Sequence, residues 1–360
     1  MKHVLFEKRN DAEFSKTLNQ RVNDYFSSTN HNRFGGKRMV IKTVFMLSLF
    51  FVPLVILSTG IVSSVGLVFA LYICSGLGMA GVGMGVMHDA IHGSYSKNPT
   101  VNRWVGYTMN LIGANANVWK IQHNVLHHTY TNIDQEDDDI NAPFFLRFSP
   151  NAKRYWIHRF QHLYIWFFYG LSTFSWITLK DYVKATRYRK MGFFPKKGQY
   201  SKLLMKITAW KLLYYSYALI LPLLMIQLPV WIIVAAFLSM HFVTGIVISI
   251  VFQTAHILSS TSFPQANEKG IIEREWIKHQ MATTSDYAPK SRVFSWLIGG
   301  LNFQVEHHLF PNICHIHYNK LAKIVSQTAK EFKIPYLVKG TFFSALWDHI
   351  LMLRQLGRAN

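Results

Sequence analysis

The chain has 360 residues, of which 50% are hydrophobic and only 16% are charged, which is lean in charge for a soluble protein. Lys and Arg number 38 against 18 acidic residues, so the formal net charge is +20. So basic a chain first suggests nucleic-acid binding, but its long uncharged apolar runs favour a membrane protein whose positive residues face the cytosol, with no nucleic-acid partner. The two cysteines, Cys74 and Cys314, are too few for a disulfide framework or a cysteine-based metal site.

Four apolar segments are long enough to cross a bilayer, which takes about 20 helical residues. A polar, basic arm over 1–39 precedes them, and the predicted spans are 40–57, 61–87, 207–226 and 230–253. Short uncharged links at 58–60 and 227–229 join the spans in two pairs, so we expect two helical hairpins. Lys211, in the first turns of the third span, is expected to extend its ammonium group to the interface.

Two further apolar stretches, 104–119 and 160–179, are predicted to lie in the membrane interface. The first is short for a span, contains three asparagines, and suits an interfacial helix. If the second crossed the membrane, the basic residues of 180–206 would lie outside, against the positive-inside rule. With both hairpin turns outside, the N-terminus, the middle section and the C-terminal part 256–360 all face the cytosol. The predicted fold is therefore an all-α integral membrane protein with four transmembrane helices and a cytosolic helical cap.

Seven of the 17 histidines fall in three dense clusters. The clusters are His-Asp-Ala-Ile-His at 88–92, His-Asn-Val-Leu-His-His at 123–128 and Gln-Val-Glu-His-His at 304–308. Histidines four residues apart share one face of a helix, and neutral imidazole is a good ligand for first-row transition metals. Seven rings exceed the needs of one ion, so the clusters predict a two-metal site in the cap if they meet. For any single pair, a packing or surface role is the alternative.

An acidic run at 134–139 follows the second cluster and is unusual in so basic a chain. A carboxylate there could hold a ligand imidazole through its second ring nitrogen. A solvated loop is the default interpretation of such a run.

The three histidine boxes, in the order HxxxH, HxxxHH and QxxHH, resemble those of the membrane-bound fatty acid desaturases. The glutamine that opens the third box and the continuation His307-His-Leu-Phe-Pro311 resemble the front-end and linoleoyl-type subgroup. The resemblance covers about 40–336, and the whole of 40–360 is expected to form one desaturase domain. It implies an O2-dependent enzyme that introduces a cis double bond into a long-chain acyl-CoA or acyl-lipid at a di-iron centre. The metal ligands that it implies, catalytic through the centre, are His88, His92, His123, His127, His128, His307 and His308, with His256 as a further ligand.

Residues near the boxes are expected to support the centre or bind the substrate. Gln304 and Asp89 would hydrogen-bond a ligand or a bound water rather than coordinate a metal. Trp119, Asn115 and Asn117 are candidates for the lining or mouth of an apolar substrate tunnel, with an interfacial aromatic belt as the alternative. His315 and His317 are expected to support a ligand side chain or to lie at the surface, and structural roles are expected for His158, His162, His241, His279 and His349.

The resemblance also implies an electron donor. Many front-end desaturases contain a fused cytochrome b5 domain with a His-Pro-Gly-Gly haem motif, which does not occur here. A separate donor is therefore expected, such as a ferredoxin, or cytochrome b5 with its reductase, attracted by the basic cytosolic surface. Zinc is expected to displace iron in overexpressed protein, because affinity tends to favour it. A bacterial inner membrane is expected rather than the endoplasmic reticulum.

Three other functions fit parts of the same pattern. A hydroxylase or ketolase could use the same scaffold and differ only in the fate of the substrate radical. A zinc-dependent membrane hydrolase would need fewer histidines and an open metal position. A non-enzymatic metal-binding membrane receptor would not require the clusters to converge beside an acyl chain.

Overall fold

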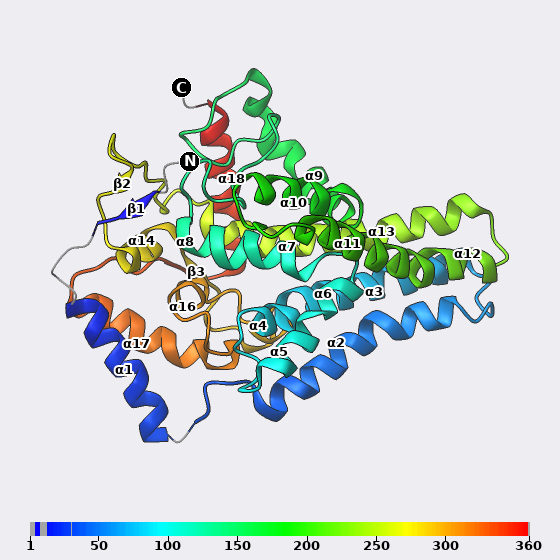
Figure 1. Cartoon of the computed structure of the whole chain (residues 1–360), viewed down its shortest axis with the longest axis horizontal. Coiled ribbons are helices and arrows are strands. Elements are labelled where there is room, and N and C mark those ends of the chain that lie inside the picture. The colour runs from blue at the N-terminus through cyan, green and yellow to red at the C-terminus, as the bar shows by residue number, and fades with distance from the viewer. Residues whose placement is uncertain (1–3, 8–12, 30, 359–360) are drawn as a thin grey trace. The chain divides into compact units, whose positions relative to one another are not determined.

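The computed structural model describes residues 4–7, 13–29 and 31–358, which are mostly helical (Figure 1). The predicted N-terminal arm 1–39 therefore lies partly outside the described residues. The chain forms two compact units. Unit 1 comprises 1–35, 122–165 and 251–360, and unit 2 comprises 36–121 and 166–250. Helices α9 (Gln161–Ser175) and α13 (Val230–His256) contribute residues to both.

Within the described residues, four helices are long and apolar enough to cross a membrane, which is the number of spans predicted. Their bounds are Gly36–Leu57, Val65–Ile91, Gln199–Met225 and Val230–His256. The first begins at 36 rather than 40 and the third at 199 rather than 207, because the basic residues at these ends are helical as well. The helical stretch over 161–180 is not one of the four.

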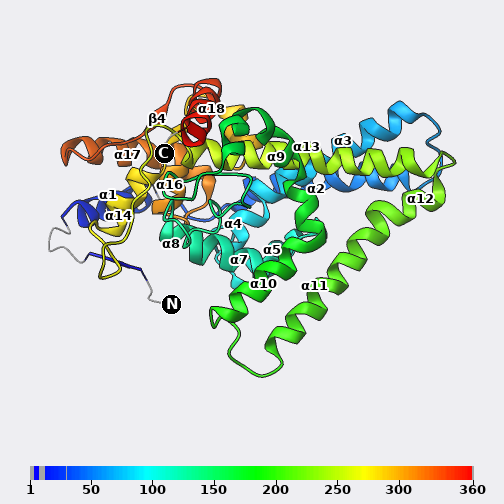
Figure 2. The same ribbon diagram turned by 90° about the horizontal axis from the view of Figure 1, so that it is seen from above.

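Close backbone contact joins three of these helices in unit 2. Helices α2 (Gly36–Leu57) and α3 (Val65–Gly85) lie side by side in both views (Figures 1 and 2). A β-carbon at Gly78 of α3 would collide with the α2 backbone at Leu49 and Phe50. One at Gly76 would lie 2.6 Å from the Met240 carbonyl oxygen of α13. The small residues of α3 therefore let two neighbouring helices approach it closely.

The segment after α3 breaks into short helices. They are α4 (Met87–Ile91), α5 (Pro99–Gly106), α6 (Thr108–Leu111) and α7 (Ala116–Lys120), so the stretch 104–119 is not one helix, contrary to expectation. Gly113 between α6 and α7 has a φ of +86°, a conformation that glycine adopts readily. Asn115 then begins α7, because its side-chain oxygen accepts hydrogen bonds from the backbone N–H groups of Asn117 and Val118.

Lys211 forms a buried ion pair and does not extend to the interface as expected. It lies on α11 (Gln199–Tyr215), and Asp181 begins α10 (Asp181–Lys190). The Lys211 ammonium lies 2.8 Å from the Asp181 carboxylate and also donates to the carbonyl oxygens of Gly113 (3.0 Å) and Trp176 (2.5 Å). Trp176 begins the π-helix η3 (Trp176–Lys180), and π-helical η4 (Ser216–Ile220) and α12 (Leu221–Met225) continue α11.

Unit 1 is built from short helices and two pairs of very short parallel strands. Its strands are β1 (Leu5–Phe6) paired with β2 (Ile271–Ile272), and β3 (Asp286–Tyr287) paired with β4 (Val338–Lys339). Its helical elements are α1 (Glu13–Thr29), η1 (Ile121–His127), α8 (His128–Tyr130), η2 (Trp156–Phe160), α14 (Trp276–Thr283), α15 (Arg292–Leu297), α16 (Gln304–Leu309), η5 (His315–His317), α17 (Tyr318–Glu331) and α18 (Phe342–Arg358).

The N-terminal helix α1 packs on α17, and the two lie side by side in both views (Figures 1 and 2). Phe14, Leu18 and Val22 of α1 are buried in one apolar cluster with Leu321 and Val325 of α17. The same cluster includes Val305 and Leu309 of α16. This core therefore supports the helix that contains the third histidine cluster.

Candidate metal centre

The second histidine cluster lies on a π-helical turn. Residues 121–127 form η1, and His128 begins α8 directly after it. A π-helix has a wider turn than an α-helix, roughly 4.4 residues, so the positions four and five after His123 flank it on one side. The ring centroids of His127 and His128 lie 5.2 and 4.8 Å from that of His123. The HxxxHH spacing thus points three imidazoles in one direction.

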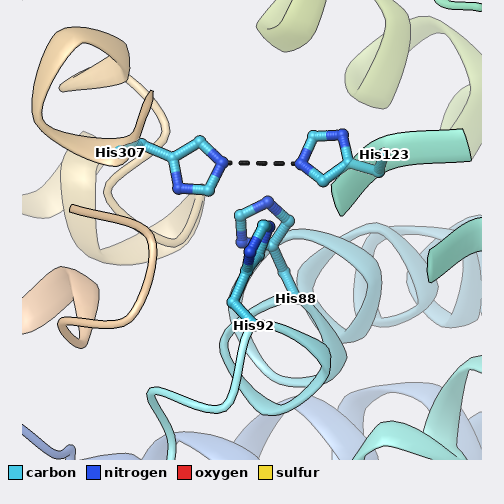
Figure 3. Close-up of side chains that lie close together, drawn as sticks. All are labelled: His88, His92, His123 and His307. Atoms are coloured by element: carbon cyan, nitrogen blue, oxygen red, sulfur yellow. Dashed lines mark hydrogen bonds between the residues drawn. The ribbon is translucent and has the colours of Figure 1, made fainter. Parts of the chain in front are cut away.

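One group of ring nitrogens meets between the second and third clusters. The Nε2 atom of His128 lies 3.3 Å from Nε2 of His123 and 2.9 Å from Nε2 of His307, and the latter two are 3.4 Å apart. Figure 3 shows His123 and His307 facing each other across this last distance. Nitrogen ligands at about 2.0–2.1 Å from a single ion are separated by roughly 3 to 3.4 Å. The spacing therefore fits one transition-metal ion better than a hydrogen-bonded cluster of imidazoles.

A second group consists of His127, His256 and His308. Their ring centroids lie 4.8 to 4.9 Å apart, and one nitrogen of each lies within 4.8 Å of the others. The Nε2 atoms of His127 and His256 are buried and have no hydrogen-bond partner among the described residues. Buried nitrogens facing each other without a partner fit a second metal ion.

In four of these histidines the other ring nitrogen, Nδ1, contacts a polar group of the protein. Nδ1 of His127 lies 3.0 and 3.1 Å from the two carboxylate oxygens of Asp137, and Nδ1 of His308 lies 2.9 Å from the side-chain oxygen of Gln280. Nδ1 of His307 contacts the Tyr318 hydroxyl at 3.2 Å, and Nδ1 of His256 contacts a backbone carbonyl at 3.3 Å. A carboxylate can only accept, so His127 donates from Nδ1 and keeps the Nε2 lone pair for a metal.

The acidic loop makes this site favourable for positive charge. Burial lowers the pKa of His127, but the Asp137 and Asp139 carboxylates raise it more, to about 9. Asp137 is fully buried, so the solvated-loop interpretation is wrong for this residue. Asp139 lies beside a second imidazole, with an oxygen 3.7 Å from Nδ1 of His123. A metal cation bound at His127 would replace the proton on that ring as the positive charge beside the Asp137 and Asp139 carboxylates.

Replacing Asp137 by Asn is expected to weaken metal binding by about 10–100-fold, the usual effect of losing a partner that orients a ligand. The amide keeps one acceptor but loses the charge, and its NH2 group would face the Asn132 N–H, which now donates to Asp137 at 2.9 Å. Metal affinity from chelator competition measures the effect. Glu136→Gln, half-buried in the same acidic run, is the matched control and is expected to keep the affinity. Equal affinities in the two variants would contradict the role assigned to Asp137.

The first histidine cluster lies in unit 2. His88 is in α4 and His92 directly follows it, with ring centroids 4.8 Å apart, as four-residue spacing on a helix predicts (Figure 3). Trp119 packs edge-on against both, at 5.6 and 6.2 Å between ring centroids. The Asp89 carboxylate lies 3.9 Å from Nδ1 of His88. Within unit 2, the His88 and His92 rings therefore lie side by side, and the Trp119 indole packs against both of them.

Residues near the boxes occupy varied positions. Asn115 is used as the α7 cap, Asn117 is exposed, and Trp119 is buried. Gln304 is buried, and neither of its polar side-chain atoms has a hydrogen-bond partner among the described residues. Such a side chain fits the expected interaction with a bound water or another small polar group. The substrate-binding roles of the three residues before the second box stay predictions.

Two buried acids hold the third cluster. Asp286 of β3 accepts a hydrogen bond from the Val305 N–H of α16 at 3.0 Å, and the Tyr336 hydroxyl donates to it at 2.5 Å. That hydroxyl also lies 3.1 Å from the carboxyl group of Glu306. Burial raises the pKa of Asp286 to about 6 and that of Glu306 well above its usual value. Burial therefore favours the protonated, neutral form of these two carboxyl groups.

No histidine pattern in the sequence indicated Gln280, Tyr318, Asp286 or Tyr336. Their partners are distant in the chain, and only a three-dimensional structure joins them. Other buried histidines contact carbonyl or hydroxyl groups instead of a histidine cluster: His158 with Phe144, His241 with Tyr214, His279 with Thr131 and His349 with Ile257. These contacts agree with the structural roles expected for those four residues.

Comparison with known proteins gives one consistent result. Residues 63–340 match the family described as "Fatty acid desaturase". The chain is 35% identical over 355 residues to an sn-1 linoleoyl-lipid 6-desaturase of Synechocystis sp., with 96% of each chain covered. It is 34% identical to an enzyme of the same name from Arthrospira platensis, covering 95% of this chain and 92% of the relative. It is also 34% identical to an acyl-lipid (8-3)-desaturase of Physcomitrium patens, covering 96% and 72%. With the histidine-rich centre and the four apolar helices, these matches show that the chain belongs to the fatty acid desaturase family, in its front-end subgroup, and is an oxidoreductase.

Proposed function

We propose that the protein is an O2-dependent acyl-lipid desaturase that introduces a cis double bond at a di-iron centre. The observation that supports this most directly is the meeting of His123, His128 and His307 at Nε2 distances of 2.9 to 3.4 Å. The lipid-linked form of the substrate is proposed because the relatives described above have linoleoyl-lipid or acyl-lipid in their names.

Each metal would be held by residues from more than one box. His123, His128 and His307 would hold one iron, and His88 and His92 would serve as further metal ligands. Their four-residue spacing, which places the two rings side by side, supports this role. His127, His256 and His308 would hold the other iron. Irons bound there supply the oxidising power that an unactivated methylene pair requires, which no side-chain acid or base can provide.

The protein residues then have positional tasks. Asp137, Gln280 and Tyr318 keep the Nε2 atoms of their imidazoles directed at the metals. Asp286 and Tyr336 hold the start of α16, which contains His307 and His308. Trp119 excludes water from the His88 and His92 side of the site and offers an apolar wall to an acyl chain.

We propose that the four apolar helices form two hairpins, with the histidine clusters in a cap on the cytosolic face of a bacterial inner membrane. The concentration of basic residues outside the apolar segments supports this orientation. Electrons would come from a separate acidic carrier such as a ferredoxin or cytochrome b5, attracted to the same basic residues.

The decisive experiment expresses the chain in a bacterial host without polyunsaturated lipids, feeds it linoleate and analyses the lipids by gas chromatography and mass spectrometry. A new fatty acid with one additional cis double bond, esterified in the membrane lipids, is expected. A His123→Ala variant made at the same level is the control and should give none. A hydroxylated product, or no product from a protein that contains two irons, would contradict the proposal.

A further inference from the structure

One helix of unit 1 exposes a row of large apolar side chains. On α18, Phe343, Trp347 and Leu351 lie four residues apart and are 78%, 62% and 40% exposed. The opposite face of the helix is buried through Leu353 and Leu356. A helix whose two faces are both apolar, with one of them open, has a second surface to cover.

Elements of unit 1 that pack on α18 also expose large apolar side chains. On α15, Val293 is 73% and Trp296 40% exposed, and Phe294 of that helix packs on Phe342 at the start of α18, with 5.1 Å between ring centroids. At the other end of α18, Gly357 packs directly on the His158 carbonyl of η2. Trp156 of η2 is 78% exposed. We name Trp156, Val293, Trp296, Phe343, Trp347 and Leu351 the apolar face.

The charges beside the apolar face are almost all positive. The segments 153–160, 290–297 and 342–358 contain one acid, Asp348, which is buried and paired with Lys339 at 2.8 Å. Exposed basic side chains flank the face on all three segments: Lys153, Arg154, Lys290, Arg292, Arg354 and Arg358. An exposed surface of this composition attracts anions and repels basic partners.

We propose that the apolar face inserts into the interfacial layer of an anionic phospholipid membrane. Tryptophan and phenylalanine beside Arg and Lys are typical of helices that lie in this layer, where rings enter the acyl boundary and cations contact phosphate groups. Exposed apolar side chains continue in sequence through Phe160, the last residue of η2, to Leu163 of α9, which are 47% and 65% exposed. The apolar face holds the cap portion of the chain against lipid independently of the spans. Insertion of this face does not require the proposed reaction, and its depth in lipid is measured without turnover.

Spin labelling of the full-length protein in lipid nanodiscs tests the depth of the face. A label on Trp347→Cys is expected to be at least several-fold more accessible to O2 than to a water-soluble nickel complex. Gln327→Cys on α17, an exposed polar position of the same unit, is the matched control and should show the reverse. Unmutated protein treated in the same way reports any label on Cys74 or Cys314. If Trp347→Cys misfolds, Phe343→Cys gives the same measurement.

Comparing the depth of the label in anionic and in neutral lipids tests the role of the basic side chains beside the apolar face. The label at 347 is expected to lie deeper in discs that contain phosphatidylglycerol than in discs of phosphatidylcholine alone, and Arg354→Glu with Arg358→Glu should remove the difference. A label at 347 that is as accessible to the nickel complex as the one at 327 would overturn the proposal and leave a soluble protein partner as the occupant. Equal depth in both lipids would overturn the anionic preference.

Discussion

Replacing His307 by alanine is expected to abolish desaturation and to lower the iron content of the purified protein, while the spans stay folded. His307 is fully buried, and its Nε2 lies 2.9 Å from that of His128 and 3.4 Å from that of His123. Losing a ligand should reduce activity by more than the roughly 10–100-fold that losing a ligand's partner costs. New double bonds in host lipids and iron per chain by mass spectrometry are the two measurements.

The matched control is His349→Ala, which removes another fully buried imidazole from the same unit. Nδ1 of His349 contacts the Ile257 carbonyl at 2.9 Å, so its loss leaves a cavity and one unpaired carbonyl but takes no ligand from either group. We expect this variant to be less stable and to retain its iron. An His307→Ala protein with full iron content and activity would remove His307 from the ligand set.

The histidine boxes could be read from the sequence because helical spacing determines which rings are neighbours. His88 with His92, and His123 with His127, have ring centroids 4.8 and 5.2 Å apart, as four-residue spacing predicts. The π-helical turn at η1 was not foreseen, since no composition rule distinguishes it from an α-helix. Its effect is to bring His128 to the side of His123.

The groups that hold the imidazoles were much harder to predict. Gln280 reaches His308 across 28 residues of sequence, and Tyr336 reaches Asp286 across 50. Neither lies in a spacing pattern, because such contacts depend on how loops fold back and not on helical periodicity. Asp137 was indicated only by its place in an acidic run, for which a solvated loop is the default interpretation.

In the apolar segments, too, the sequence predicts the helices better than it predicts where they break and what they contact. The four apolar helices follow from length and hydropathy alone. The break before α7 depends on Gly113, which has a positive φ, and on Asn115, which caps the helix. Because glycine and asparagine also occur inside longer helices, the sequence alone does not determine this break. Lys211 looked like an interfacial cation because its partner, Asp181, is 30 residues away and belongs to another helix.

Lys211→Met is expected to destabilise the protein strongly. Lys211 and Asp181 are 6% and 3% exposed and 2.8 Å apart, so removing the ammonium leaves a buried carboxylate and two carbonyl groups without their donor. Breaking a buried pair from one side costs about 3–5 kcal/mol. The midpoint of thermal unfolding in detergent should fall sharply, and the loop at Gly113 that precedes the second box should become more susceptible to proteolysis.

The double variant Lys211→Met with Asp181→Asn distinguishes an uncompensated charge from lost packing. Because it removes both charges, it should be more stable than Lys211→Met alone, and a double-mutant cycle gives the coupling free energy. Lys206→Met, an exposed lysine on the same helix, should change stability by no more than about 0.5 kcal/mol. If Lys211→Met were as stable as Lys206→Met, the Asp181 carboxylate in the variant would have to be paired with another group or protonated. The ion pair would then not be what holds α11 to the loop before the second box.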